Sequence, residues 1–223
     1  MNSNEEYVKQ LEETIAKFLE PLENIPFPIA IKAISGYRVI PFNNEDDVDK
    51  ALLGRLIKAM KIATKTANEE GIFTARPNEV GNHIEPFVKD ALLKVGVKEV
   101  DIPQTVKGTR QAAGYPDLFI RDVDDRVTYL ECKTYNRKSI GSSFRAFYFS
   151  PPSRENSKIT TDARHLVATF EIEIAERNNK RAYVPVRWKL YSLDTMLVQV
   201  KHEFNASNKQ MYRPEALLAE GTF

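Results

Sequence analysis

Apolar residues recur every three or four positions in three segments of the chain, a period typical of amphipathic helices. These segments run from Asn4 to Leu22, from Asp46 or Asp47 to about Glu70, and from Asn82 to Val95. Gly71 and Gly96 follow the second and third segments and predict that the helices end there. The first helix is expected to serve packing or a dimer contact.

Other segments have the period of β-strands, with apolar and polar residues alternating or with short apolar runs. We expect strands over Lys98–Val106, Tyr115–Arg121 and Arg126–Tyr135, and a β-hairpin from Leu166 to Tyr191 that turns at Asn178-Asn179-Lys180. Residues 25–41 are rich in Pro and Gly and are expected to form a loop with at most short strands. Residues 195–204 fit a strand or a helix, and Pro214–Ala219 predicts a short terminal helix.

The second and third predicted strands bring two carboxylates and a lysine together. Side chains alternate along a strand, so Glu131 and Lys133 share one face while Cys132 points to the other. Folding the two strands back on each other about the polar turn between them would set Asp117 roughly opposite Leu130, next to Glu131. The sequence therefore predicts a metal-sized space that is bordered by Asp117, Glu131 and Lys133.

Glu85 is a further candidate, from the predicted helix 82–95. It falls at the edge of the apolar stripe, so its side chain leans either toward a neighbouring sheet or toward water. Asn82-x-x-Glu85 is also the spacing of a capping box, and Pro86 fits best in a first helical turn. A capping role and a role at the site therefore both remain open for Glu85.

The charge of the chain is balanced, with 32 Lys and Arg against 31 Asp and Glu and a net charge of +1. A nucleic-acid partner would therefore have to be bound by a local basic patch. Between Cys132 and Thr161 the only acid among the basic residues is Glu155. We interpret this stretch, directly downstream of the carboxylates, as the place where a phosphodiester strand lies; an ordinary solvated loop is the alternative.

Competing kinds of site have little support in the sequence. The three histidines, His83, His165 and His202, have no zinc spacing and are expected at the surface or at strand ends. Cys132 is expected to be a buried structural thiol, and a single cysteine forms no intramolecular disulfide. The chain shows no secretory signal or membrane span, so we expect an intracellular, cytoplasmic protein in a reducing compartment.

The chemistry that suits the central residues is phosphodiester hydrolysis, which needs an in-line water and neutralisation of charge on the phosphate. Mg²⁺ prefers oxygen ligands, commonly one or two carboxylates with waters and substrate phosphate. Asp117, Glu131 and the backbone carbonyl of Cys132 supply such ligands. Lys133 could orient the attacking water or help to deprotonate it.

Pro116-Asp117, followed by Glu131-Cys132-Lys133 at the end of the next apolar strand, resembles the PD-(D/E)XK motif of the nuclease superfamily that includes many type II restriction endonucleases. The resemblance implies an α/β (α+β) fold with a restriction-endonuclease-like core, in which helices flank a central mixed β-sheet. It implies that Asp117 and Glu131 are metal ligands and that Lys133 is the catalytic lysine. Family members often carry a glutamate on the upstream helix, which Glu85 would match. Two predicted strands follow the motif where a helix is usually expected first.

We therefore expect a Mg²⁺-dependent type II restriction endonuclease that acts as a homodimer on a short specific site in double-stranded DNA. The alternatives are a repair or junction-resolving nuclease of the same superfamily, a non-catalytic DNA-binding module on this fold, or a surface hairpin with a mere ion pair. We expect a single domain, 1–223, with 1–75 as a helical addition and 76–223 as the catalytic core. The candidates for DNA contact are Lys107, Arg110, Gln111, Asn136, Arg137, Lys138 and Arg145.

Overall fold

The computed structural model describes residues 3–76, 79–111, 113–139, 141, 147–149, 153–202 and 205–219. Its contacts divide the chain into two compact units, a larger one over Pro26–Leu197 and a smaller one made of Met1–Ile25 and Val198–Phe223. The expectation of a single nuclease domain with an addition over 1–75 and a core over 76–223 stays a prediction.

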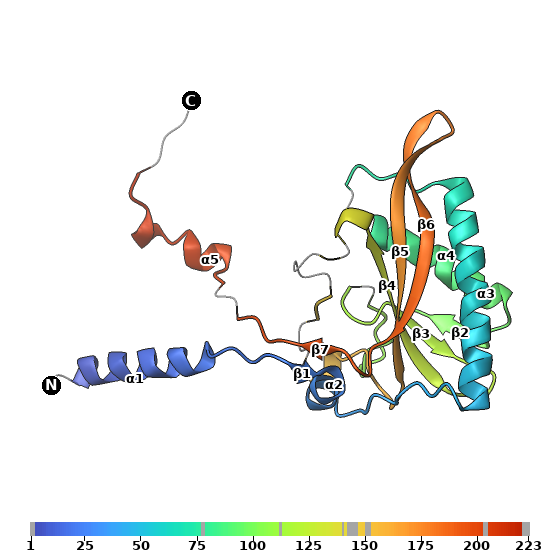
Figure 1. Cartoon of the computed structure of the whole chain (residues 1–223). Coiled ribbons are helices and arrows are strands. Elements are labelled where there is room, and N and C mark those ends of the chain that lie inside the picture. The colour runs from blue at the N-terminus through green and yellow to red at the C-terminus, as the bar shows by residue number, and fades with distance from the viewer. Residues whose placement is uncertain are drawn as a thin grey trace. The chain divides into compact units, whose positions relative to one another are not determined.

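The larger unit is built on a mixed five-stranded sheet with the strand order β2-β3-β4-β5-β6 (Figure 1). Only β4 and β5 run parallel; the other neighbours are antiparallel. The strands are β2 (Glu99–Asp101), β3 (Leu118–Arg121), β4 (Val127–Tyr135), β5 (Arg164–Arg177) and β6 (Lys180–Ser192). Each strand predicted around the motif is confirmed, although β2 and β3 are shorter than expected. The β5–β6 hairpin is confirmed as well, and Asn178 and Asn179 both have the positive φ that a tight two-residue turn requires.

Two helices, α3 (Asp47–Glu70) and α4 (Val80–Lys94), pack on one face of this sheet (Figure 1). They confirm the second and third predicted helices. The Asp46 side chain caps α3 by accepting a hydrogen bond from the Asp49 amide, and Gly71 follows its last residue. Fully buried apolar side chains of both helices meet those of β4 and β5, which makes one continuous core under the sheet.

The expected loop over residues 25–41 is wrong, because α2 (Phe27–Ser35) forms there. Pro26 is its N-cap and Pro28 lies in its first turn, where a missing amide N–H costs no helical hydrogen bond. Phe27 and Ile31 are one helical turn apart and both are fully buried. Burial of this apolar pair therefore decides the local structure against the loop-forming composition.

The smaller unit contains α1 (Ser3–Phe18), α5 (Asn208–Met211) and a short 3₁₀ turn over Pro214–Ala216. The first predicted helix is confirmed, although it ends before Leu22. The terminal helix expected over 214–219 is only that turn. Among the described residues of 195–204 the regular structure is β7 (Leu197–Val198), which pairs with β1 (Ile25–Pro26). None of the described helices combines the length and the apolar character needed to cross a membrane.

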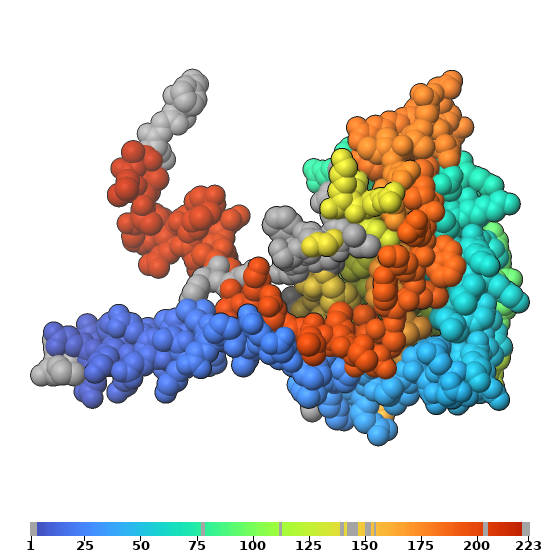
Figure 2. All heavy atoms as spheres, in the orientation of Figure 1, coloured from blue at the N-terminus to red at the C-terminus, as the bar shows by residue number. Residues whose placement is uncertain are grey.

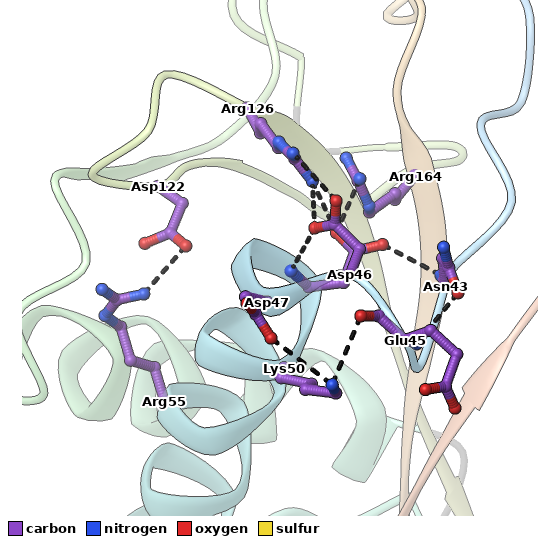
Figure 3. A network of polar contacts seen from close by, with 10 residues as sticks. Asn43, Glu45, Asp46, Asp47, Lys50, Arg55, Asp122, Arg126 and Arg164 are labelled. Carbon is purple, nitrogen blue, oxygen red and sulfur yellow. Dashed lines mark hydrogen bonds and ion pairs between the residues drawn. The ribbon is translucent and has the colours of Figure 1, made fainter.

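A buried acid, Asp49, joins the start of α3 to the starts of β4 and β5. Figure 3 shows Asp46, Arg126 and Arg164, which surround it in the same polar network. The Oδ1 of Asp49 lies 2.6 Å from Nη2 of Arg164 and 3.1 Å from Nη1 of Arg126. Its Oδ2 accepts a hydrogen bond from the backbone N–H of Asn43. Arg126 also pairs with Asp46 at 2.7 Å. Arg126 directly precedes β4 and Arg164 opens β5, so this network fixes the beginning of both strands.

Candidate active site

The hairpin of β3 and β4 sets the position of Asp117. Leu118 pairs with Leu130, and continuing this antiparallel register sets Asp117 opposite Glu131. The expected position, opposite Leu130, was therefore wrong by one residue. The Asp117 Oδ2 accepts a hydrogen bond of 2.7 Å from the Cys132 amide. The expected register was wrong because the connecting turn, which includes Asp125 at φ 57°, sets the loop length and with it the register.

Glu131 and Lys133 project from the same face of β4 and form an ion pair of 2.6 Å between Nζ and Oε1. The Glu131 side chain is only 4% exposed. Its second oxygen, Oε2, is buried and has no hydrogen-bond partner among the described residues. Cys132 points into the core on the other face, and burial raises the pKa of its thiol well above the usual value. A nucleophilic role for Cys132 is therefore disfavoured.

The electrostatics of the carboxylates reflect burial and mutual repulsion. Burial and, after it, the charge of Asp117 together raise the pKa of Glu131 to about 7, although Lys133 acts in the opposite direction. Burial also raises the pKa of Asp117. For Lys133, burial acts to lower the pKa, but the attraction of Glu131 and Asp117 is stronger and holds it above the ordinary value. The site therefore concentrates negative charge that a cation would stabilise.

The third acid is Glu85, on α4. The helix begins at Val80 with Glu79 as its N-cap, so Asn82 is not a capping residue and the capping-box alternative is wrong. Burial, followed by the charges of Asp117 and Glu131, raises the pKa of Glu85 to about 7. The structure thus brings Glu85 into the electrostatic environment of the two motif carboxylates.

A second lysine, Lys158, also acts on the carboxylates of the site, and no function was predicted for it from the sequence. It is buried, and its Nζ donates hydrogen bonds to the carbonyls of Gly114 at 2.5 Å and Ala113 at 3.5 Å. Its charge lowers the pKa of Asp117 and Glu131. Lys158 lies within the basic stretch noted in the sequence, but only a contact across 44 residues reveals which loop it binds.

An aromatic cluster supports the turn that leads into Asp117. The Tyr115 hydroxyl lies 2.5 Å from Nδ1 of His165, and Phe27, Phe147 and Phe149 pack edge-on or tilted around the Tyr115 ring. His165 is the second residue of β5, so of the two expected positions the strand end is confirmed, and its side chain is buried. Burial lowers the pKa of His165 to about 3, so the ring is neutral at physiological pH.

The residues predicted to contact DNA have varied surroundings. Lys107 pairs with Glu155 at 2.5 Å and Arg110 with Asp101 at 2.7 Å, so both cations have acidic neighbours. Gln111 is exposed, as are Asn136, Arg137 and Lys138 directly after β4. Arg145 lies outside the described residues. Contact with DNA stays a prediction for all of them.

A magnesium ion fits the oxygen atoms that the site presents. Within the described ranges, no group of three or more His, Cys, Asp and Glu side chains is arranged to hold a metal. Mg²⁺ commonly takes only one or two carboxylates and completes its shell with waters, carbonyls and phosphate. The buried and unpaired Oε2 of Glu131, next to Asp117, matches that requirement.

A mixed sheet with helices packed on it, an aspartate and a Glu-x-Lys pair on adjacent strands, and an acid on the upstream helix define a nuclease of the PD-(D/E)XK superfamily. A family model described as "Type II restriction enzyme MjaV family" matches residues 21–215. The type II restriction enzyme MjaV of Methanocaldococcus jannaschii is 37% identical and aligns over 96% of each chain.

The chain therefore belongs to the type II restriction enzyme MjaV family, and the expected class, a type II restriction endonuclease and hence an endodeoxyribonuclease, is confirmed. A crystal structure of the tetrameric restriction endonuclease SfiI bound to cognate DNA is also similar. It has a TM-score of 0.40 and 14% identity, and the match covers 70% of this chain and 67% of that one.

Proposed function

We propose that Asp117 and Glu131, together with the carbonyl of Cys132, bind Mg²⁺, and that Lys133 orients the attacking water during hydrolysis of a phosphodiester bond in double-stranded DNA. The observation that carries this assignment is the buried Glu131, with one oxygen paired to Lys133 at 2.6 Å and the other unpaired beside Asp117. When bound, the ion would neutralise charge on the phosphate and lower the pKa of a bound water.

Lys133 acts as a hydrogen-bond donor in this proposal. Its raised pKa keeps the ammonium protonated at neutral pH, and a protonated lysine accepts no proton from water. It can hold a water or a phosphate oxygen at a fixed position and stabilise negative charge that develops on the phosphate. Of the two roles expected from the sequence, orientation is therefore favoured over deprotonation.

Glu85 completes the acidic site from the side of α4. Its pKa of about 7 means that it exchanges a proton readily near neutral pH. We assign it the role of accepting a hydrogen bond from a water held between Asp117 and Glu131. This position also agrees with the glutamate that superfamily members often carry on this helix.

The active form is proposed to be a homodimer, because cutting both strands of a short symmetrical site requires two copies of the site. Large apolar side chains of α1 and the residues after it are exposed and available for such a contact. They are Tyr7, Val8, Leu11, Ile15, Phe18, Leu19 and Leu22.

A digest with sequenced ends tests the proposed function. The protein is incubated with plasmid and phage DNA in Mg²⁺ or in EDTA, and the fragment ends are sequenced. Discrete fragments in Mg²⁺ alone, all ending at one short sequence, are the expected result. Intact DNA across many sequences, or equal cutting in EDTA, would contradict it. Branched DNA is the control that separates a junction-resolving nuclease from an enzyme specific for linear sites.

A further inference from the structure

The sheet face that carries Glu131 and Lys133 continues across β5 and β6. Lys133 pairs with Thr169 of β5, and Thr169 pairs with Lys189 of β6. Paired residues on neighbouring strands project to the same face, so these three side chains form one row across three strands. The next row along the strands is Tyr135, Glu171 and Arg187.

Side-chain contacts join the two rows. The Lys189 Nζ lies 5.9 Å from the centroid of the Tyr135 ring, so this lysine leans across β5 toward the strand that carries Lys133. The Tyr135 hydroxyl donates a hydrogen bond of 3.5 Å to Oε2 of Glu171, and Nε of Arg187 lies 3.8 Å from the same oxygen. An aromatic ring and a buried acid therefore hold both cations in place.

The two rows carry an excess of positive charge. Lys133 is paired with Glu131, and the other two cations, Lys189 and Arg187, have only one acid in these rows, the buried Glu171. The side chain of Arg187 is 62% exposed. The alternate residues of β6, such as Trp188 and Leu190, pack against the core instead.

This surface is accessible and borders the site directly. In the sheet β5 lies between β4 and β6, and the space-filling view shows the orange atoms of the β5–β6 hairpin exposed beside the yellow atoms at the end of β4 (Figure 2). Neighbouring strands are about 4.8 Å apart, so Lys189 starts roughly 10 Å from Lys133. At one phosphate per 3.4 Å of helix axis in each strand, that distance corresponds to about three nucleotides.

We propose that Lys189 and Arg187 bind phosphates of the DNA strand that is being cut, a few nucleotides from the scissile phosphate. The inference rests on the proposed function of Asp117, Glu131 and Lys133, because it takes their site as the position of the scissile phosphate. Polyanionic DNA is the partner that matches a cationic surface next to a nuclease site. Such contacts fix the path of the strand and carry no sequence information directly.

Binding of a fluorescently labelled 30-base-pair duplex in EDTA, between 50 and 200 mM KCl, tests the inference. Lys189→Ala and Arg187→Ala are each expected to reduce the slope of log K against log salt by about 0.9, and the double variant by about 1.8. Lys94→Ala is the matched control. It removes the same charge from the last residue of α4, the helix packed on the other face of the sheet, and the wild-type slope is expected.

Two further variants separate lost charge from lost packing. Lys189→Gln keeps most of the stem beside Tyr135 and is expected to lose the contact as Lys189→Ala does, while Lys189→Arg restores it. The fragment ends produced in Mg²⁺ are expected to stay the same in every variant that cuts, because phosphate contacts do not select the sequence.

Unchanged slopes for Lys189→Gln and Arg187→Ala, with wild-type cleavage intact, would overturn this inference and leave the proposed function standing. Reduced slopes in a protein that never cuts DNA would support the cationic surface and contradict the proposed function. A slope reduced equally by Lys94→Ala would show a general charge effect and would also overturn the inference.

Discussion

Glu131 has two opposing influences on its charge. Burial and the neighbouring Asp117 disfavour the carboxylate, while the Lys133 ammonium at 2.6 Å favours it, and the first influence is the stronger one. The folded protein therefore binds a proton at Glu131 more tightly than the unfolded chain does. Ionised carboxylates at this site therefore destabilise the folded protein without metal, and the same negative charge suits a divalent cation.

Stability without metal is expected to fall as the pH rises. The pKa of Glu131 rises from 4.5 to about 7, so between these values the unfolded chain releases a proton that the folded chain keeps, and ionisation favours unfolding. The unfolding free energy in EDTA is expected to be lower at pH 8 than at pH 4.5, with a contribution from Glu131 on the order of 3 kcal/mol. Urea denaturation of the wild type and of Glu131→Gln measures it. A Glu131→Gln variant with the full wild-type pH dependence would contradict this account.

Lys158 is expected to tune the same carboxylates. Because its charge lowers the pKa of Glu85, Asp117 and Glu131, its removal raises these values, and more alkaline conditions are then needed to ionise the site. Lys158→Met is expected to shift the half-maximal point of the pH–rate profile for cleavage upward, and Lys158→Arg to shift it less. An unshifted profile in Lys158→Met would show that the lysine serves only the Gly114 loop.

At the scale of elements, the sequence predicted the helices and strands whose signals are local. The helix α3 has an acidic N-cap and a glycine after its end, and β4 is rich in β-branched and aromatic residues. The helix α2 was missed, because the burial of Phe27 and Ile31 that stabilises it is not a local property. The register of the β3–β4 hairpin depends on the turn before β4, and the register predicted from the sequence was wrong by one residue. Lys158 and His165 act through partners 44 and 50 residues away, which periodicity cannot reveal.

The Asp49 network is expected to be a main source of stability for the starts of β4 and β5. Asp49→Ala leaves the Arg164 guanidinium, whose side chain is only 10% exposed, without this carboxylate. Loss of one partner from a buried pair typically costs about 3 kcal/mol or more of unfolding free energy. Denaturant unfolding measures it against Asp47→Ala, a neighbouring acid that is 96% exposed and is expected to change stability by less than about 0.5 kcal/mol. Equal effects of the two variants would rule out this role for Asp49.

At the scale of the whole molecule, the α1 helix and its exposed apolar side chains are the proposed contact with a second copy. The chain has a mass of 25.5 kDa, so sedimentation velocity of the proposed homodimer is expected to give about twice that value. The double variant Leu11→Glu/Ile15→Glu places charge on the apolar stripe and is expected to sediment as a monomer. Lys9→Glu, on the polar side of α1, is the control and is expected to remain a dimer. A double variant that stays dimeric would move the interface elsewhere.

The division of work among Asp117, Glu131 and Lys133 is the central claim. Single-turnover cleavage of plasmid DNA in Mg²⁺, with wild type, Asp117→Asn, Lys133→Met and the Lys94→Ala control, tests it most directly. The account predicts that Asp117→Asn and Lys133→Met each cut at least about 100-fold more slowly while Lys94→Ala cuts at the wild-type rate. A Lys133→Met or Asp117→Asn enzyme that cuts DNA as fast as the wild type would contradict it.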